Sequence, residues 1–263
     1  MRLLVSGENN MKQKQVLLSG VIITKNEHER LAACIQALRF CDEVVVLDNG
    51  SEDDTVEIAR HHGAVVHSLP DGDFAQMRNY AKEHVRGKWL LYIDADEIVT
   101  QELADQIVHA VHDWKSGNPD VYALHRKNYY LGFLWPTHEW MTRLFRVPAL
   151  IEWKGAVHET PITLGPVGKL SAYLLHDTHR NLEQMVQKTN EWSKTEAKLR
   201  FDAGHPKITW WRFIRVMMTG FWQSYITQGG WKAGAVGWIE SIFQAFSMFV
   251  TYAKLWELQN DRK

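Results

Sequence analysis

The sequence lacks an excess of charge of either sign. Its 263 residues contain 30 lysines and arginines against 31 aspartates and glutamates, for a net charge of −1. Because a nucleic-acid-binding surface usually gives a domain a basic field, no nucleic-acid partner is expected. Cysteine is scarce as well, since Cys34 and Cys41 are the only two and lack the spacing of a metal site. A disulfide scaffold is therefore excluded, and a reducing compartment is indicated.

Long apolar runs are also missing. Residues 1–15 contain no apolar core of the length that a signal peptide needs. Near the C-terminus, residues 216–231 carry no charge, but they include glutamine, serine and glycine. This stretch is shorter than the roughly 20 predominantly apolar residues of a membrane-spanning helix. It is therefore not expected to cross a membrane.

The N-terminal part alternates between continuous apolar runs and amphipathic stretches. Strands are expected at 17–24, 43–47, 64–67 and 89–93, and helices at 29–39, 53–62 and 74–85. Because strands that are apolar throughout are buried on both faces, this pattern predicts an α/β fold. The sheet is expected to be mostly parallel, with helices on both faces.

The pattern changes after a helix expected at 101–114. Short mixed segments follow, which we interpret as antiparallel strands and loops laid beside the sheet: 121–126, 141–147, 151–153, 162–164 and 170–176. From residue 181 the sequence is helical. We therefore expect one α/β domain over residues 15–180 and a helical extension over 181–263.

Three carboxylates follow the fourth strand, at Asp94, Asp96 and Glu97. Ligands of open α/β sheets bind beyond the carboxyl ends of the strands. Neighbouring carboxylates repel each other in a partly buried site unless a cation lies between them. Mg²⁺ or Mn²⁺ takes oxygen ligands and commonly bridges to substrate phosphates. The pattern predicts a metal–diphosphate site; the alternative is a solvated acidic turn that caps the helix beginning near Thr100.

The C-terminal part is rich in aromatic residues, which gather in residues 208–226 and 231–258. Tryptophan and tyrosine prefer the boundary between membrane and water, where basic side chains meet anionic headgroups. We expect an interfacial helical hairpin and a peripheral membrane contact through residues 208–258. The alternative is that the helices pack on the α/β domain or on a second subunit of a homodimer.

Four segments carry a resemblance to a known family: VIITKNE at 21–27, VVLDNGSEDDT at 45–55, AQMRN at 75–79 and DADE at 94–97. In this order they resemble the motifs of family 2 inverting glycosyltransferases, which have the GT-A fold. The resemblance covers about residues 17–180. The later segments RLFR at 143–146 and WKGAVHE at 153–159, with the aromatic tail, resemble the branch of bacterial lipopolysaccharide inner-core β-1,4-glucosyltransferases.

The resemblance implies a nucleotide-binding set at Thr24, Asn26, Glu27, Asp48, Arg78 and Asp94. Asp48 would accept a hydrogen bond from uracil, and residues 24–27 would frame the base and ribose. Arg78 would contact the nucleotide, and Asp94 the ribose or the metal. The alternatives are local roles: a turn bonded to its own backbone for Asp48, a helix cap for Asn26, and a solvated side chain for Arg78.

The resemblance also implies the reactive groups. Asp96 would hold the metal that bridges both phosphates, and His176, at the end of a strand, would be a further metal ligand. Inverting transfer needs one general base, because the metal stabilises the departing diphosphate. We predict Glu159 as this base, with Asp177 as the second candidate. The alternatives are a surface glutamate for Glu159 and a structural histidine for His176.

Three residues are predicted to meet the acceptor. Arg143 and Arg146 are expected to alternate on one side of a strand and would bind an acceptor phosphate, while Trp140 would form part of a sugar platform. Alternatively, the arginines flank Leu144 as exposed residues and the tryptophan is a packing residue.

Together these features predict a metal-dependent inverting hexosyltransferase that uses a nucleotide diphosphate sugar, most simply a UDP-sugar. Its acceptor would be a lipid-linked or lipopolysaccharide-core saccharide at the cytoplasmic face of a bacterial plasma membrane. One alternative is a nucleotidyltransferase, but residues 24–27 lack the glycine-rich loop of such enzymes. The other is a non-catalytic, membrane-docked scaffold, and the intact acidic pair argues against it.

Overall fold

The computed structural model describes residues 15–155, 159–179 and 181–260 of the chain. Four strands pair in parallel in the order β3-β2-β1-β4, as the continuous apolar runs predicted. They are β1 (Leu18–Thr24), β2 (Glu43–Asp48), β3 (Val65–Ser68) and β4 (Trp89–Asp94). All seven residues of β1 are buried, because this strand lies between two others and is covered on both faces.

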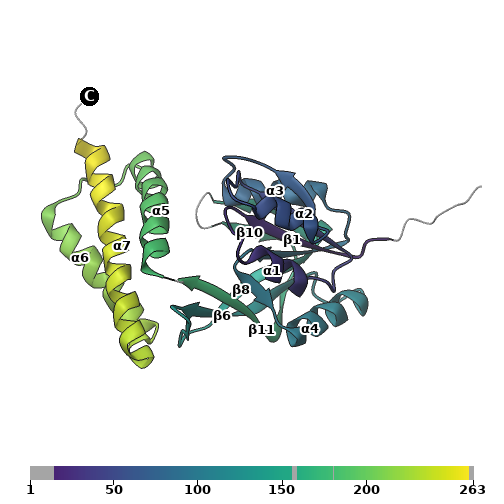
Figure 1. Cartoon of the computed structure of the whole chain (residues 1–263). Helices are drawn as coiled ribbons and strands as arrows, with labels where there is room; N and C mark the ends of the chain where they lie inside the picture. Colours follow the sequence, from purple (N-terminus) through teal and green to yellow (C-terminus); the bar gives the residue numbers. More distant parts are fainter. Residues whose placement is uncertain (1–14, 156–158, 180, 261–263) are drawn as a thin grey trace, which may run out of the picture.

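Helices cover the two faces of this parallel half. The helices are α1 (Leu31–Ala37), α2 (Thr55–His61), α3 (Phe74–His84) and α4 (Gln101–His112). Leu31 of α1 and Leu103 of α4 pack in one buried cluster with Leu91 and Ile93 of β4. The other cluster contains Met77 of α3. This arrangement confirms the predicted α/β class with helices on both faces (Figure 1).

The later strands extend this same sheet. β8 (Glu139–Arg146) pairs antiparallel with β4, and the order continues through β6 (Val121–Tyr130), β11 (Val167–His179) and β5 (Glu97–Val99). With β7 (Phe133–Leu134), the described residues form one nine-stranded mixed sheet. Our prediction that these segments lie beside the sheet was therefore wrong for β6, β8 and β11. Only β9 (Leu150–Lys154) and β10 (Thr160–Thr163), after the turn η1 (Val147–Ala149), form a separate two-stranded sheet.

A helical extension follows β11. It comprises α5 (Leu182–Asp202), α6 (Trp210–Trp222), the π-helical turn η2 (Gln223–Thr227), the 3-10 turn η3 (Gly230–Ala233) and α7 (Gly234–Asn260). The three long helices pack against one another beside the sheet domain (Figure 1). The turn between α6 and α7 is tight, since a Cβ atom on Gly237 would lie 1.8 Å from the carbonyl oxygen of Gly230. The two aromatic stretches are thus helices of one hairpin.

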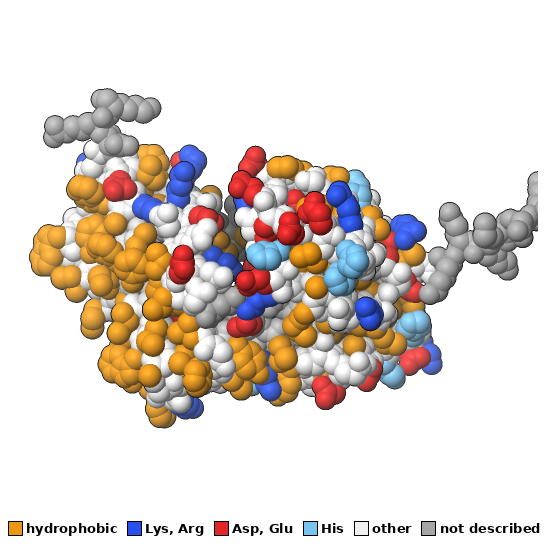
Figure 2. Space-filling view, viewed as in Figure 1, with side chains coloured by type: hydrophobic (Ala, Val, Ile, Leu, Met, Phe, Trp, Pro, Cys, Tyr) orange, Lys and Arg blue, Asp and Glu red, His pale blue; other side chains and the backbone are white. Residues whose placement is uncertain are grey.

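The hairpin exposes apolar side chains along one stripe of each helix. On α6 they include Trp210 at 75% exposure and Trp222 at 63%, and on α7 they recur at Trp238, Ile242 and Phe249. Figure 2 shows this apolar surface over the side of the molecule that α6 and α7 form. In the described chain, residues 230–260 also form a helix long and apolar enough to cross a membrane by length and composition alone, with a mean hydropathy of 1.3 over an 18-residue window.

Candidate functional site

The candidate site lies where β1, β2 and β4 end side by side. The register places Thr24 opposite Asp48 and Ile23 opposite Asp94, so the predicted residues meet at one edge of the sheet. The Thr24 hydroxyl is buried there and makes no hydrogen bond with the described residues. Because buried polar groups are normally hydrogen-bonded, this hydroxyl is a suitable partner for a bound molecule.

The loops after β1 and β2 bind each other. Asn26, with a φ of +53°, accepts a hydrogen bond from the Glu52 amide at 2.8 Å, and its own amide donates to Ser51 Oγ at 2.9 Å. Asp48 accepts hydrogen bonds from the amides of Gly50 and Ser51 at 3.1–3.2 Å. Asp48 therefore makes the turn contacts that we gave as its alternative, whereas Asn26 does not cap α1, which Arg30 precedes, but links the two loops. These contacts fix the loop shape around the buried Thr24 hydroxyl.

Asp94 is clamped by two buried arginines. Arg78 Nη2 donates to Asp94 Oδ1 at 2.8 Å, and Arg143 Nη2 donates to Oδ2 at 2.6 Å. Burial alone would raise the pKa of Asp94, but the charges of Arg143 and Arg78 outweigh it and hold this pKa well below its ordinary value. Asp94 is therefore an ionised anchor at the end of β4.

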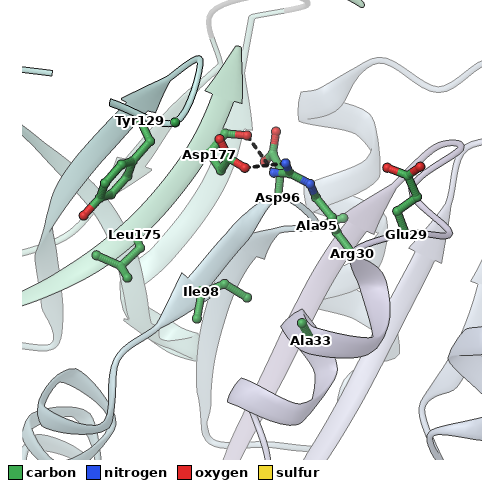
Figure 3. Close-up of a pocket in the computed structure, with 10 residues that line it drawn as sticks. Glu29, Arg30, Ala33, Ala95, Asp96, Ile98, Tyr129, Leu175 and Asp177 are labelled. Atoms are coloured by element: carbon green, nitrogen blue, oxygen red, sulfur yellow. Dashed lines mark hydrogen bonds and ion pairs between the residues drawn. The ribbon is translucent and has the colours of Figure 1, made fainter. Parts of the chain in front are cut away.

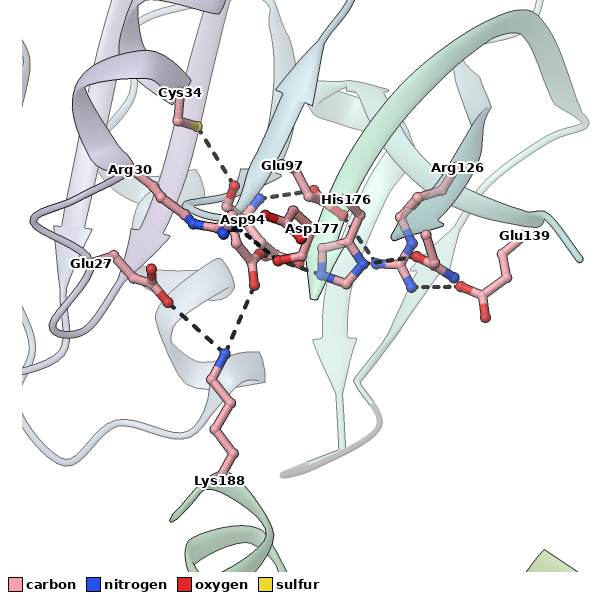
Figure 4. Close-up of polar contacts among 12 residues, drawn as sticks. Glu27, Arg30, Cys34, Asp94, Glu97, Arg126, Glu139, His176, Asp177 and Lys188 are labelled. Carbon is pink, nitrogen blue, oxygen red and sulfur yellow. Dashed lines mark hydrogen bonds and ion pairs between the residues drawn. The ribbon is translucent and has the colours of Figure 1, made fainter. Parts of the chain in front are cut away.

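Glu97 points inward, although the sequence placed it on the acidic edge. It is fully buried, accepts from Arg126 Nη1 at 3.0 Å, and lies 3.7 Å from Arg143 Nη2. Its other oxygen accepts from the Asp94 amide at 2.9 Å, which closes the turn after β4 (Figure 4). Glu97 thus stabilises the site from within.

Asp96 is the carboxylate that remains for a cation. Its Oδ1 lies 3.5 Å from His176 Nε2, and His176 Nδ1 lies 2.8 Å from Asn128 Oδ1. Burial works to raise the pKa of Asp96, but the hydrogen bond and charge of His176, followed by the charge of Lys188, lower it below its ordinary value. The structure thus brings together the two residues predicted as metal ligands.

The ligand set at this point is small. Among the described residues, no group of three or more histidine, cysteine, aspartate or glutamate side chains is arranged to hold a metal ion. Mg²⁺ in phosphate-transferring sites is often bound by one or two carboxylates, with substrate phosphates and water completing its shell. Asp96 with His176 therefore fits a divalent ion that arrives with a diphosphate.

The two predicted bases lie in different surroundings. Glu159 Oε1 accepts from Arg78 Nε at 3.1 Å and lies 3.0 Å from Nη2 of the same arginine, so it is attached to the Asp94 clamp. Asp177 forms an ion pair with Arg30 and donates its backbone N–H to the Asp96 carbonyl at 3.2 Å. Residues 156–158, which precede Glu159, lie outside the described residues.

A cavity of about 450 Å³ lies between α1 and the ends of β6 and β11 (Figure 3). Asp96, Asp177 and Arg30 form its polar part. The rest of the lining is aromatic, aliphatic or acidic: Glu29, Ala33, Ala95, Ile98, Tyr129, Gly132 and Leu175. A space of this size beside the candidate cation ligands can hold a small polar molecule with a hydrophobic face.

The predicted acceptor residues do not lie together. Arg143 is buried against Asp94, whereas Arg146 pairs with Asp120 at 3.5 Å and stacks on Trp114 at 4.0 Å. Arg146 lies opposite Trp89, at the other end of β4 from the acidic edge. Residues three apart on a strand point to opposite faces, so our prediction that both arginines lie on one side was wrong.

Trp140 lies on an exposed aromatic surface. Its ring stacks on His125 with centroids 4.5 Å apart, and Lys169 Nζ lies 4.7 Å from its centre. His125 and the cavity residue Tyr129 are four positions apart on β6, so their side chains lie on the same face of the sheet. Trp140 is thus on the face of the sheet that carries the cavity.

Sequence reasoning missed four charged residues that shape this site. Arg126 and Arg30 pair with Glu97 and Asp177, and Lys188 of α5 approaches Asp96 at 3.9 Å. The fourth, Glu139, accepts from Arg126 Nη2 at 2.6 Å. The only sequence signal was the large number of acids near β4, which require cationic partners if they are buried.

Comparisons with known proteins agree on one family. The model of the family described as Glycosyl transferase family 2 matches residues 19–164. An uncharacterized glycosyltransferase of Rickettsia prowazekii is 30% identical over 258 residues, covering 92% of this chain and 87% of that protein. The lipopolysaccharide core biosynthesis glycosyltransferase LpsC of Rhizobium meliloti is 27% identical over 256 residues, covering 91% and 92%. A mycobacterial protein of known crystal structure has a similar fold, with a TM-score of 0.50, 14% identity, and coverage of 73% and 76%.

We predict that Arg143→Met destabilises the protein by about 3–5 kcal/mol, because it leaves Asp94 and Glu97 buried without one of their cations. The matched control is Arg146→Met on the same strand, where the loss of a half-exposed pair and a stacked ring should cost no more than about 1 kcal/mol. Urea denaturation measures both changes. If both variants lose the same free energy of unfolding, the ion pair of Arg143 with Asp94 stabilises the protein no more than the exposed pair of Arg146 does.

Proposed function

Because the chain belongs to glycosyltransferase family 2, we propose that it transfers a hexose from a UDP-sugar, with inversion and with the help of Mg²⁺ or Mn²⁺. The observation that carries this proposal is the pair of Asp96 and His176, 3.5 Å apart beside a 450 Å³ cavity. The pair lies beside the ends of the parallel strands, where α/β folds bind nucleotides. Residues 15–180 would supply the catalytic unit. A glycosyltransferase family also argues against the nucleotidyltransferase and scaffold alternatives.

The nucleoside would bind over the ends of β1 and β2. In the part of the chain that the structure describes, the buried Thr24 hydroxyl has no hydrogen-bond partner, and neither has the buried donor Arg78 Nη1. Asn26 and Asp48 shape the loops around this position, and Glu27 borders it. These features support donor binding by the residues that the family motifs indicate.

The metal would be held by Asp96 and His176 together with the two phosphates of the donor. When bound, it would neutralise the charge that develops on the leaving diphosphate. Asp94 would act differently, because its two oxygens are already held by Arg78 and Arg143. Its part would be to keep the end of β4 rigid and to present the ribose side of the site.

One carboxylate must take the proton of the acceptor hydroxyl. We assign this role first to Glu159, whose contact with Arg78 places it beside the Asp94 clamp. Asp177 is the second candidate, since it borders the cavity together with Asp96. As the hydroxyl oxygen attacks the anomeric carbon, its proton passes to the base and the diphosphate leaves from the opposite face.

The acceptor would be a glycolipid or a lipopolysaccharide-core saccharide. LpsC, which is named for lipopolysaccharide core biosynthesis, aligns over nearly the whole of this chain and supports the proposal. The acceptor sugar would enter the cavity, and Trp140 would extend the contact along the same face of the sheet. Arg146 is not part of this surface.

We further propose that the helical extension, residues 181–263, binds the inner face of the bacterial plasma membrane through residues 208–258. Its exposed stripe contains tryptophans, which prefer the interface, and basic residues near it can meet anionic lipids: Lys207, Arg212, Arg215 and Lys232. Lys254, which the sequence also suggested, is instead bonded to Asn190 of α5. α7 also packs on α5 and α6 along its length and buries Glu240. A helix packed in this way fits a membrane surface better than a single span. A homodimer that covers the stripe is the competing outcome.

Asp96→Asn should remove the metal-dependent binding of UDP and lower transfer by at least about 100-fold, because the ion loses its carboxylate ligand. Thermal shift with UDP in the presence and absence of Mn²⁺ measures the first effect. Asp105→Asn on α4 is the control, since Asp105 is exposed and contacts only Gln101 among the hydrogen bonds found. Full activity of the parent chain in a chelator would contradict the metal role.

Glu159→Gln should lower the transfer rate by about 10²–10⁴-fold and change UDP affinity little, because a general base acts mainly in the chemical step. Asp177→Asn is the matched variant and should cost less than about tenfold. Transfer rates and UDP affinities of both variants decide between them. The reverse order of rates would assign the base to Asp177, and lost UDP binding in Glu159→Gln would make Glu159 structural.

The double variant Trp210→Glu and Trp222→Glu should reduce binding to phosphatidylglycerol vesicles on the order of tenfold or more, because it places charges in the interfacial stripe. Val65→Glu, which changes an exposed apolar position on β3 outside the stripe, should bind as the parent does. Cosedimentation measures the binding. If the parent chain stays in the supernatant and elutes as a dimer, the stripe is a subunit interface.

A further inference from the structure

Helix α5 of the extension reaches the acidic edge of the catalytic domain. Lys188 Nζ lies 3.9 Å from Asp96 Oδ2 and 4.0 Å from Glu27 Oε1 (Figure 4). One turn further along α5, the Trp192 ring contacts Phe74 of α3 with centroids 6.2 Å apart. Lys188 therefore lies at the candidate nucleotide site, although it belongs to the helical extension and not to the α/β domain that carries the family motifs.

The ammonium group of Lys188 lies near two carboxylates but forms a short contact with neither. Both carboxylates are farther away than a hydrogen bond allows, and 43% of the Lys188 side chain is exposed. A cation held in this way can move to a new anion without breaking a short contact. Lysine binds phosphate as a flexible point charge, which suits such a movement.

We propose that Lys188 is a positioning residue that binds the donor diphosphate. This inference rests on the proposed function, because it assumes that the diphosphate arrives beside Asp96. Without nucleotide, Lys188 balances the charges of Glu27 and Asp96. When a metal and the diphosphate are bound, Asp96 would hold the metal and Lys188 would turn to a phosphate oxygen.

The same residue then assists departure of the leaving group. The bond between the anomeric carbon and the β-phosphate oxygen breaks, and its electron pair stays on the diphosphate. The ammonium charge of Lys188 neutralises part of the charge that accumulates there. No proton has to pass to or from Lys188 in this step.

The helical extension thereby becomes part of the catalytic site. Lys254 of α7 hydrogen-bonds to the side-chain oxygen of Asn190 on α5 at 2.8 Å, two positions after Lys188. The hairpin that carries the apolar stripe is thus attached to the helix that presents the lysine. Anything that moves α7 relative to the sheet would also move Lys188.

The test uses the full chain with Lys188→Met, its conservative partner Lys188→Arg, and Lys198→Met as a control on the same helix. Lys198 pairs only with Asp202 in the ion pairs of the described residues and is 73% exposed. Calorimetry measures the affinity for UDP with Mn²⁺, for uridine, and for Mn²⁺ alone.

Lys188→Met should weaken UDP binding about 10- to 100-fold, the effect of a hydrogen bond between charged groups, and leave uridine binding unchanged. It should also bind Mn²⁺ alone more tightly than the parent, because a competing cation has left Asp96. Lys188→Arg should retain most of the UDP affinity, and Lys198→Met all of it.

Two results would overturn the proposal. UDP affinity of Lys188→Met within twofold of the parent would show that the lysine does not bind the diphosphate, and equal losses for UDP and uridine would show a structural defect. Failure of the parent chain to bind UDP with any divalent metal is a different result. It would overturn the proposed function itself, and the role of Lys188 with it.

Discussion

The pairing of two carboxylates at the end of β4 with arginines is the constraint on which the site depends. Glu97 is fully buried and Asp94 partly so, and Arg78, Arg143 and Arg126 surround them. A buried charge without such partners costs several kcal/mol, so each cation must be in place for the edge to fold. Arg126 and Arg143 come from β6 and β8, which are continuous with the sheet, and Arg78 comes from α3.

The three acids of the motif differ in how tightly their neighbours hold them. Because Asp94 is held on both oxygens and Glu97 is enclosed, neither is available to an incoming cation without the loss of an ion pair. Asp96 is held less tightly, because the nitrogen of His176 lies at 3.5 Å and that of Lys188 at 3.9 Å. Either side chain can move away from Asp96 without breaking a short hydrogen bond. The acidic motif thus contains two carboxylates held by arginines and one whose contacts are longer than a hydrogen bond or close to its limit.

The sequence predicted the parallel half of the fold well, because strands buried on both faces must be apolar throughout. It also placed Thr24, Asp48 and Asp94 correctly at one edge, since parallel strands end together. The pairing of β4 with β8 was not predictable in the same way, because a strand that follows a crossover can join either edge of a sheet. β5 was missed for a related reason: its three residues begin with Glu97, a carboxylate whose burial depends on Arg126, a residue 29 positions away.

Lys188 of α5 is the clearest example of a site residue that the sequence did not predict. Lys188 is 92 positions from Asp96 and belongs to a helix whose pattern resembles any amphipathic surface helix. Only the packing of Trp192 on Phe74 and of Lys254 on Asn190 sets its position over the acidic edge. Because these contacts join the aromatic hairpin to the strand ends, the extension and the nucleotide site must be considered together. If the acceptor lies in a membrane, as we propose, such a link would be useful, since the helix proposed to meet the lipid would be fixed to the helix proposed to meet the donor.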